Sequence, residues 1–238
     1  MTSVDAFWVY LQAGPLLWLV VTLGAYSAAF ALFRLGRGNP LLNPVAIAVA
    51  LIIALLVATG TDYQTYFRGA QFVHFLLGPA TVALGLPLWR NLGSARRLLV
   101  PMAVALLAGA VTAIGSAVAV AALFGASQAT LASLAPKSVT TPIAMAISER
   151  LGGLPSLTAA LVILTGIIGA IVVTPLMNVL RIADWRVRGF AAGLAAHGIG
   201  TARAFQVNQL AGTFAGIAMA LNGLVTAMLA PLLLGWLR

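Results

Sequence analysis

The heptapeptide Pro136-Lys137-Ser138-Val139-Thr140-Thr141-Pro142 lies in a region, Leu98 to Ser148, in which Lys137 is the sole charged residue. Its two prolines interrupt helical hydrogen bonding. A lone ammonium group in hydrocarbon costs about 2.5–3.5 kcal/mol on insertion scales, so it normally faces a polar cavity or a partner. Non-helical backbone at membrane depth is tolerated where it is buried in protein or lines a wet cavity. The heptapeptide therefore predicts a broken helix inside a membrane protein, with Lys137 as the first functional candidate.

The composition around this segment is that of a membrane protein. The 238 residues are 62% hydrophobic and 7% charged, and the mean hydropathy is +1.06. A membrane-spanning helix needs about 20 apolar residues. Charge-free runs of this kind cover Ala6–Phe33, Leu41–Thr61, Gly69–Trp89, Leu98–Pro136, Leu151–Leu180 and Ala204–Leu237. We expect an all-α polytopic membrane protein, a single integral membrane domain over residues 1–238, with about seven to eight membrane segments.

Several functional classes are disfavoured by what the sequence lacks. The net charge is +9, but the arginines are spread over short loops, which indicates the positive-inside rule and no nucleic-acid partner. The chain has no cysteine, no P-loop and no metal-ligand spacing. Paired carboxylates and a nucleophile elbow are also missing. We therefore expect neither an enzyme nor a bound metal or cofactor.

Charge placement predicts the topology. Arg34 and Arg37 follow the first apolar run, so this loop is expected in the cytoplasm and the N-terminus outside. If residues 128–150 crossed the membrane completely, the arginines of segment 181–188 would reach the wrong face. We expect 128–150 to enter and return on the outer side, although a full crossing remains an alternative. The C-terminus is then expected in the cytoplasm.

Two further motifs are expected at similar depth. About ten residues at 1.5 Å each place Lys137 roughly 15 Å inside a 30 Å core. Residues 78–83 and 198–203 share Gly and Thr at matching offsets, and their host segments run in opposite directions. Inverted repeats with discontinuous helices surround midplane substrate sites in many transporters. We therefore expect inverted-repeat character, with repeats of about 1–125 and 126–238 and broken helices meeting at the midplane.

The heptapeptide has the chemistry of an anion site. Lys137 supplies a full positive charge, Ser138, Thr140 and Thr141 supply hydroxyls, and N–H groups at a helix start attract anions. A small carboxylate suits this combination. The plainer alternative is a kinked helix whose lysine reaches an interface.

Four other residues are weaker candidates. His197 lies beside two glycines, titrates near neutral pH and is a candidate proton carrier, although a packing histidine is the alternative. Arg203 is either a binding residue or an arginine at the outer interface. Thr81 stands in a Gly/Pro-interrupted span that is equally well explained as a kink. Glu149 is a candidate for neutralising Lys137 or coupling protons.

Four blocks of the chain resemble a known family. They are Leu41-Leu42-Asn43-Pro44, Leu77-Gly78-Pro79-Ala80-Thr81-Val82-Ala83-Leu84, Pro136 to Met145, and Ala196-His197-Gly198-Ile199-Gly200-Thr201-Ala202. They look like the signature blocks of the LrgB/CidB/YohK family, which is similar to the C-terminal half of the plastid glycolate/glycerate translocator. The resemblance spans nearly the whole chain, and it places Thr201 with Lys137, Ser138, Thr140, Thr141 and His197 in the shared blocks.

The resemblance implies two functions of different classes. One is a secondary transporter of small monocarboxylates or 2-hydroxycarboxylates, of the pyruvate, glycolate or glycerate kind, in the bacterial inner membrane. The other is a holin-like or antiholin-like protein that modulates murein hydrolase export and autolysis with an LrgA/CidA-type membrane partner. We expect the transporter, with Lys137 opposite the carboxylate, and a homodimer or higher homo-oligomer. A third possibility is a stabilising subunit for that partner.

Overall fold

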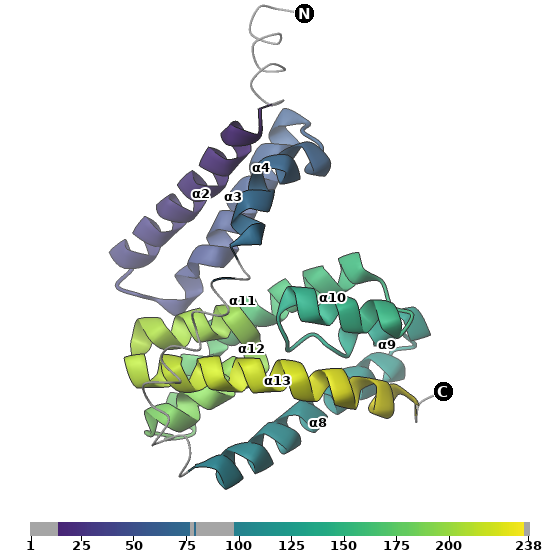
Figure 1. The fold of residues 1–238 in the computed structure, drawn as a ribbon. Coiled ribbons are helices and arrows are strands. Elements are labelled where there is room, and N and C mark those ends of the chain that lie inside the picture. The colour runs from purple at the N-terminus through teal and green to yellow at the C-terminus, as the bar shows by residue number, and fades with distance from the viewer. Residues whose placement is uncertain (1–13, 77–78, 80–97, 236–238) are drawn as a thin grey trace, which may run out of the picture. The chain divides into compact units, whose positions relative to one another are not determined.

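The computed structural model describes residues 14–76, 79 and 98–235, and every regular element within them is a helix (Figure 1). The chain divides into two compact units, unit 1 (Met1–Ala83) and unit 2 (Leu84–Arg238). Each unit is built around its own helix packing. The repeat boundary expected near residue 125 stays a prediction.

Four helices of the described residues are long and apolar enough to cross a membrane. They are α2 (Pro15–Leu35), α8 (Leu99–Leu123), α11 (Pro155–Val179) and α13 (Gln209–Gly235). The apolar helix α3 (Pro44–Thr59) is shorter, with 16 residues. Large apolar side chains cover their surfaces, as expected for helices whose solvent is lipid. The all-helical membrane class is confirmed, whereas the expected count of seven to eight segments is not confirmed within the described part.

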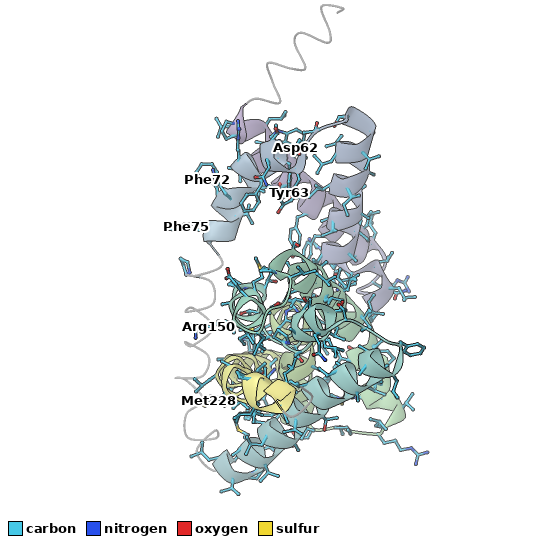
Figure 2. The ribbon with its side chains drawn as sticks, turned by 90° about the vertical axis from the view of Figure 1, so that its right-hand side faces the viewer. Asp62, Tyr63, Phe72, Phe75, Arg150 and Met228 are labelled. Carbon is cyan, nitrogen blue, oxygen red and sulfur yellow. The ribbon has the colours of Figure 1, made fainter. Side chains whose placement is uncertain are left out.

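Unit 1 consists of α2, the 3-10 helix η1 (Pro40–Leu42), α3 and α4 (Tyr63–Phe75). Asn43 caps α3: its side-chain oxygen accepts hydrogen bonds from the N–H groups of Val45 and Ala46, and Pro44 occupies the first turn. The helix start expected at this Asn-Pro pair is confirmed. On α4, Phe72 and Phe75 are exposed at the surface of the unit (Figure 2).

In unit 2, α8 and α13 run in the same direction. Near their first residues, Met102 of α8 and Phe214 of α13 share one apolar cluster. Near their last residues, Val118 and Leu234 share another. Corresponding ends of the two helices therefore lie at the same end of the unit.

Helix α11 runs in the opposite direction to α8 and α13. Its early residue Val162 belongs to the same cluster as Val118 and Leu234, whereas its late residue Val173 packs beside Trp185 at the start of α12 (Trp185–Val207). We call the end of unit 2 with Arg181, Arg186 and Arg188 the arginine end. The other end, where α8 stops and α11 begins, is called the Ser127 end.

The segment between α8 and α11 forms a helical hairpin. Helix α9 (Gln128–Leu134) is followed by a non-helical link over 135–140 and by α10 (Thr141–Arg150), and the two helices lie near the C-terminal end of α13 (Figure 1). The backbone N–H of Leu154 donates a 2.7 Å hydrogen bond to the hydroxyl of Ser133 on α9. The chain thus returns to the Ser127 end from which it entered. The helix break predicted between the two prolines is present.

Helix α12 also folds back on itself. Ala196 and His197 have non-helical backbone angles, so the helix consists of a first arm before them and a second arm after them. A methyl group at Gly200 would touch the carbonyl of Ala192, and Ala204 shares a cluster with Ala192. A straight helix separates residues 192 and 204 by about 18 Å. The second arm therefore returns along the first.

This turn bears on two expectations. Arg203, expected either at a binding site or at the outer interface, is carried by the second arm to a pocket that Arg188 and Trp185 also line. Helix α13 then starts at the arginine end and carries Gly235 to the Ser127 end. The C-terminus was expected on the same face as the arginines, whereas Gly235, the last described residue, lies at the opposite end of unit 2; the membrane side of the chain ends stays a prediction.

Small residues bring α13 close to the first arm of α12. Methyl groups built on Gly189 and Gly193 would overlap the carbonyl oxygens of Ala211 and Ala215, respectively. Glycines four residues apart form one stripe of the helix, which permits this close approach of two backbones. The stripe therefore holds the first arm of α12 in register with α13.

We expect Gly193→Ala to lower the melting temperature of the purified protein by about 3–8 °C, since overpacking against backbone costs about 1–3 kcal/mol. The matched control is Gly115→Ala on α8, where an added methyl group meets nothing within 4 Å. This control should be neutral or slightly stabilising, because alanine is the better helix former. Equal melting temperatures for the two variants would contradict the close packing described here.

Candidate functional site

The first element of the candidate site is the link between α9 and α10, which we call the first tip (residues 136–142). Val139 is completely buried and anchors the link in the apolar core. Ser138 is buried, whereas Lys137, Thr140 and Thr141 are half-buried. Among the described residues, the Lys137 ammonium group has no ion-pair partner, since the sole ion pair joins Asp184 and Arg186 at the arginine end.

The start of α10 adds polar backbone to the first tip. Thr140 is the N-cap residue, and its side chain makes no capping hydrogen bond. Pro142 lies in the first turn, where its missing N–H group costs nothing. The N–H groups of this first turn have no acceptor within the helix. They belong to the same short segment as the Lys137 side chain.

The second element is the break in α12, which we call the second tip (residues 194–201). His197 has φ 41° and ψ −131°, a backbone conformation that costs a non-glycine residue about 1–3 kcal/mol. Its imidazole is buried, and Nε2 lies 2.9 Å from the carbonyl oxygen of Val162. Because a carbonyl only accepts, Nε2 carries the proton of this hydrogen bond. The neighbouring Gly166 leaves the space that the ring occupies.

The second tip is supported by α13. The hydroxyl of Thr201 donates to the carbonyl of His197 at 2.8 Å, and it lies 3.8 Å from the sulfur of Met219. A Cβ at Gly198 would lie 3.9 Å from that same sulfur. Met219 therefore packs against the start of the second arm, directly after the turn.

Asn222 joins the two tips. This residue of α13 has no exposed surface, and its amide nitrogen donates to the carbonyl of Leu194 at 3.0 Å and to the carbonyl of Ser138 at 3.4 Å. Its amide oxygen accepts from the hydroxyl of Thr226 at 3.3 Å. The first tip enters from the Ser127 end and the second from the arginine end, so the two meet at this side chain.

Sequence reasoning missed Asn222, although a signal was present. It is the one amide inside the apolar stretch from Leu210 to Gly235. A buried polar group in apolar surroundings needs partners. In the sequence alone, its two carbonyl partners lie 28 and 84 residues away, and neither distance suggests contact.

The remaining candidates lie elsewhere. Glu149 is exposed near the end of α10 and forms no ion pair with Lys137. Arg203 lines the pocket with Arg188 and Trp185, away from the tips. Thr81 lies outside the described residues. The structure therefore brings Lys137, Ser138, His197 and Thr201 into one region and leaves Glu149 and Arg203 out of it.

Charge is distributed unequally between the ends of unit 2. The arginine end carries Arg181, Arg186, Arg188 and Arg203 with Asp184 as its described acid, whereas the Ser127 end carries the neutral pair Glu149–Arg150. Arg188 is held by the carbonyl of Ile182 and stacks on the ring of Trp185, 4.9 Å from its centroid. The described residues contain no cluster of three side chains suited to a metal ion.

Asp184 caps α12 by accepting a hydrogen bond from the backbone N–H of Arg186 at 2.8 Å. Hydrogen bonds from the side chain and backbone of Arg186 lower the pKa of the Asp184 carboxyl group to about 2. The same pairing raises the pKa of the Arg186 guanidinium group.

A comparison with known proteins identifies the family. The profile of the LrgB-like family matches residues 22–236. The chain belongs to this family. The family-wide match covers α3, both tips and α13.

Individual members of the LrgB-like family align over most of their length. The Bacillus subtilis protein YwbG, which is uncharacterized, is 33% identical over 195 residues, covering 82% of this chain and 87% of YwbG. The holin-like protein CidB of Staphylococcus epidermidis is 31% identical over 196 residues, with 82% and 86% covered. The antiholin-like protein LrgB of Bacillus cereus is 28% identical over 218 residues, with 92% and 95% covered. No solved structure matches the chain.

The Asp184 cap predicts a pH-dependent contribution to stability. Asp184→Ala should lower the free energy of unfolding at neutral pH by about 1 kcal/mol, as for other N-caps. Because the pKa of Asp184 is depressed in the folded chain, this contribution is present above the ordinary value near 3.8 and is lost as the pH falls toward about 2. Thermal unfolding of the wild type and of Asp184→Ala between pH 6 and pH 2.5 measures this contribution to stability.

The control for this prediction is Asp184→Asn, which keeps a capping oxygen without a titrating group. Neither substituted residue titrates, so the difference in stability between Asp184→Asn and Asp184→Ala should stay constant with pH, while the wild type loses stability relative to both as the pH falls. A difference between wild type and Asp184→Ala that stays constant down to pH 2.5 would show that the carboxylate does not stabilise this helix start.

Proposed function

We propose that this LrgB-like protein is a secondary transporter of small monocarboxylates or 2-hydroxycarboxylates. The observation that carries the proposal is the meeting of two helix breaks, from opposite ends of unit 2, at Asn222. Broken helices that meet inside a membrane protein provide backbone groups and charges for a solute at mid-depth. Such a site can be reached alternately from either end.

An inverted arrangement of helices supports the transporter. We infer that unit 2 contains two structural repeats of opposite orientation. The first is α8 with the α9–α10 hairpin, and the second is α11 with the folded α12. Helices α8 and α11 have 25 residues each and run in opposite directions, and each is followed by a segment that turns back. This pairing lies within 98–208 and so differs from the repeats of about 1–125 and 126–238 that the sequence suggested.

The chemistry of the first tip favours a solute that carries a single carboxylate group. Lys137 is a half-buried cation, Thr140 and Thr141 are half-buried hydroxyls, and the first turn of α10 presents N–H groups. In this proposal Lys137 and the turn bind the carboxylate, and the threonines bind the 2-oxo or 2-hydroxy oxygen. One fixed positive charge suits a monoanion better than a dianion.

The second tip completes the proposed site. His197 donates from Nε2 to Val162, so a further proton would bind at Nδ1. This makes His197 the proton carrier of the proposal. Thr201 holds the His197 carbonyl and thereby shapes the second tip. In the first tip, the carbonyl of the buried Ser138 accepts a hydrogen bond from Asn222.

The charge asymmetry orients the unit in the proposal. The positive-inside rule places the arginine end in the cytoplasm of a bacterial cell. The α9–α10 hairpin then enters the inner membrane from outside, the folded α12 enters from the cytoplasm, and Gly235 lies at the outer face. A homodimer and an LrgA/CidA-type partner are compatible with this arrangement.

The names of the relatives favour a second candidate, a holin-like or antiholin-like role. The family resemblance of the sequence connects such a role with murein hydrolase export. A pore that passes proteins needs a wide polar lining. The described helices present mostly apolar surfaces, so many copies of the chain or the partner protein would have to supply this polar lining. A third role, as a stabilising subunit of that partner, predicts that the purified chain has no activity of its own.

Uptake of labelled pyruvate, glycolate and glycerate into proteoliposomes tests the transporter. We expect saturable uptake by the wild type and a decrease of about 10- to 100-fold in Lys137→Ala, the effect of losing one charge-assisted hydrogen bond. Lys137→Arg should retain part of the rate. The matched control is Arg150→Ala, which removes an exposed cation from the same hairpin and should transport normally (Figure 2).

The same vesicles separate the candidate functions. Release of entrapped dyes of different sizes, without saturation, would favour the holin-like pore over the transporter. Absence of both uptake and dye release with the folded chain alone, and activity once the partner protein is added, would favour the subunit role. Uptake by Lys137→Ala at the wild-type rate would show that Lys137 does not bind the transported solute.

Cysteine labelling tests the two re-entrant segments, since the chain has no cysteine of its own. Single cysteines at Ser127 and Arg150 should react with an impermeant reagent from one side of the membrane. Cysteines at Arg186 and Asn208 should react from the other side, because α12 starts and ends at the arginine end. Reaction of Asn208 from the Ser127 side would mean that α12 crosses the membrane.

A further inference from the structure

Asn222 differs from every other buried polar side chain described on α13. Thr213 bonds to the carbonyl of Gln209 in its own helix, and Thr226 bonds to Asn222 itself. Asn222 alone among them directs its donors to other segments, the carbonyls of Leu194 and Ser138. An asparagine amide has two donors, and both are used.

The two carbonyls that Asn222 binds belong to interrupted backbone. In an unbroken α12, the carbonyl of Leu194 would accept from the N–H of residue 198, but the turn at Ala196 and His197 separates them. Ser138 lies in the non-helical link of the first tip. Asn222 thus supplies the N–H donors that these two carbonyls do not receive from a continuous helix.

Neighbouring residues on α13 keep Asn222 at this point. Met219, one turn earlier, lies against Gly198 and Thr201 of the second tip. Gly223, the next residue, faces Ile143 in the first turn of α10: an added Cβ would lie 3.0 Å from the Ile143 methyl group. One stretch of α13 therefore touches both tips, and Asn222 is the polar residue within it.

We propose that Asn222 is a positioning residue that holds the first and second tips together and thereby places Lys137 at the solute site. This inference rests on the proposed function, because the site it positions is the carboxylate site of the two tips. Asn222 itself need not touch the solute, since its amide is occupied by protein. Its loss separates the tips and leaves Lys137 intact but misplaced.

A double-mutant cycle in proteoliposomes tests this role. Asn222→Ala should raise the KM for the transported carboxylate by about fivefold for each net hydrogen bond lost. In the Lys137→Ala background the same substitution should have little further effect, because the group it positions is absent. The matched control is Thr213→Val, which removes a buried hydroxyl of α13 that bonds only within its own helix and should leave KM unchanged.

A second readout does not depend on transport. In the cysteine-free chain, a cysteine at Thr140 reports on the first tip and a cysteine at Arg150 on the base of the same hairpin. Asn222→Ala should speed thiol labelling at position 140 about fivefold and leave position 150 unchanged. Should the alanine variant fail to fold, Asn222→Ser retains one donor and should show a smaller increase at 140.

The outcomes distinguish the two proposals. Absence of carboxylate uptake by the wild type, together with faster labelling at 140 in the variant, would refute the proposed function and retain the joining of the tips. Unchanged labelling at 140 would overturn the inference about Asn222. Additive effects of the Asn222 and Lys137 substitutions on KM would also overturn it, since independent contributions indicate general stabilisation.

Discussion

Hydrogen bonding of interrupted backbone is the constraint on which unit 2 depends. A membrane helix that stops midway leaves N–H and C=O groups that neither water nor lipid can satisfy in hydrocarbon. In the part of unit 2 that the structure describes, two helices are interrupted, and a single amide on a third helix, Asn222, donates to a carbonyl at each interruption. The breaks have further supports: Thr201 bonds the His197 carbonyl, the His197 ring bonds the Val162 carbonyl, and the Ser133 hydroxyl accepts from the Leu154 N–H.

Close packing by small residues makes this arrangement possible. Gly189 and Gly193 let the first arm of α12 approach α13 at backbone distance, and Gly166 admits the His197 ring beside α11. A side chain at Gly189 or Gly193 would overlap the backbone of α13, so the glycines permit the approach that brings Leu194 beside Asn222. Packing and hydrogen bonding therefore depend on each other, and the strained backbone of His197 is tolerated because its surroundings hold it on several sides.

Family membership and geometry point in different functional directions. The relatives with functional names are described as holin-like or antiholin-like, whereas two helix breaks around a half-buried lysine are the features of a solute site. A holin-like or antiholin-like name does not specify a transported molecule, so it does not conflict with the proposed carrier. The proposed site is built only from contacts within this chain.

The sequence by itself determined the membrane class, the helix start at Asn43-Pro44 and the break between Pro136 and Pro142. These features depend on local chemistry: apolar length, a capping side chain and proline's missing N–H group. Only the tertiary structure decided that α12 turns back at His197, that Arg203 joins Arg188 and that α13 ends opposite the arginines. Each of these results from contacts between segments far apart in the chain, above all those of Asn222, and a charge pattern read along the sequence cannot distinguish a helix that crosses from one that returns.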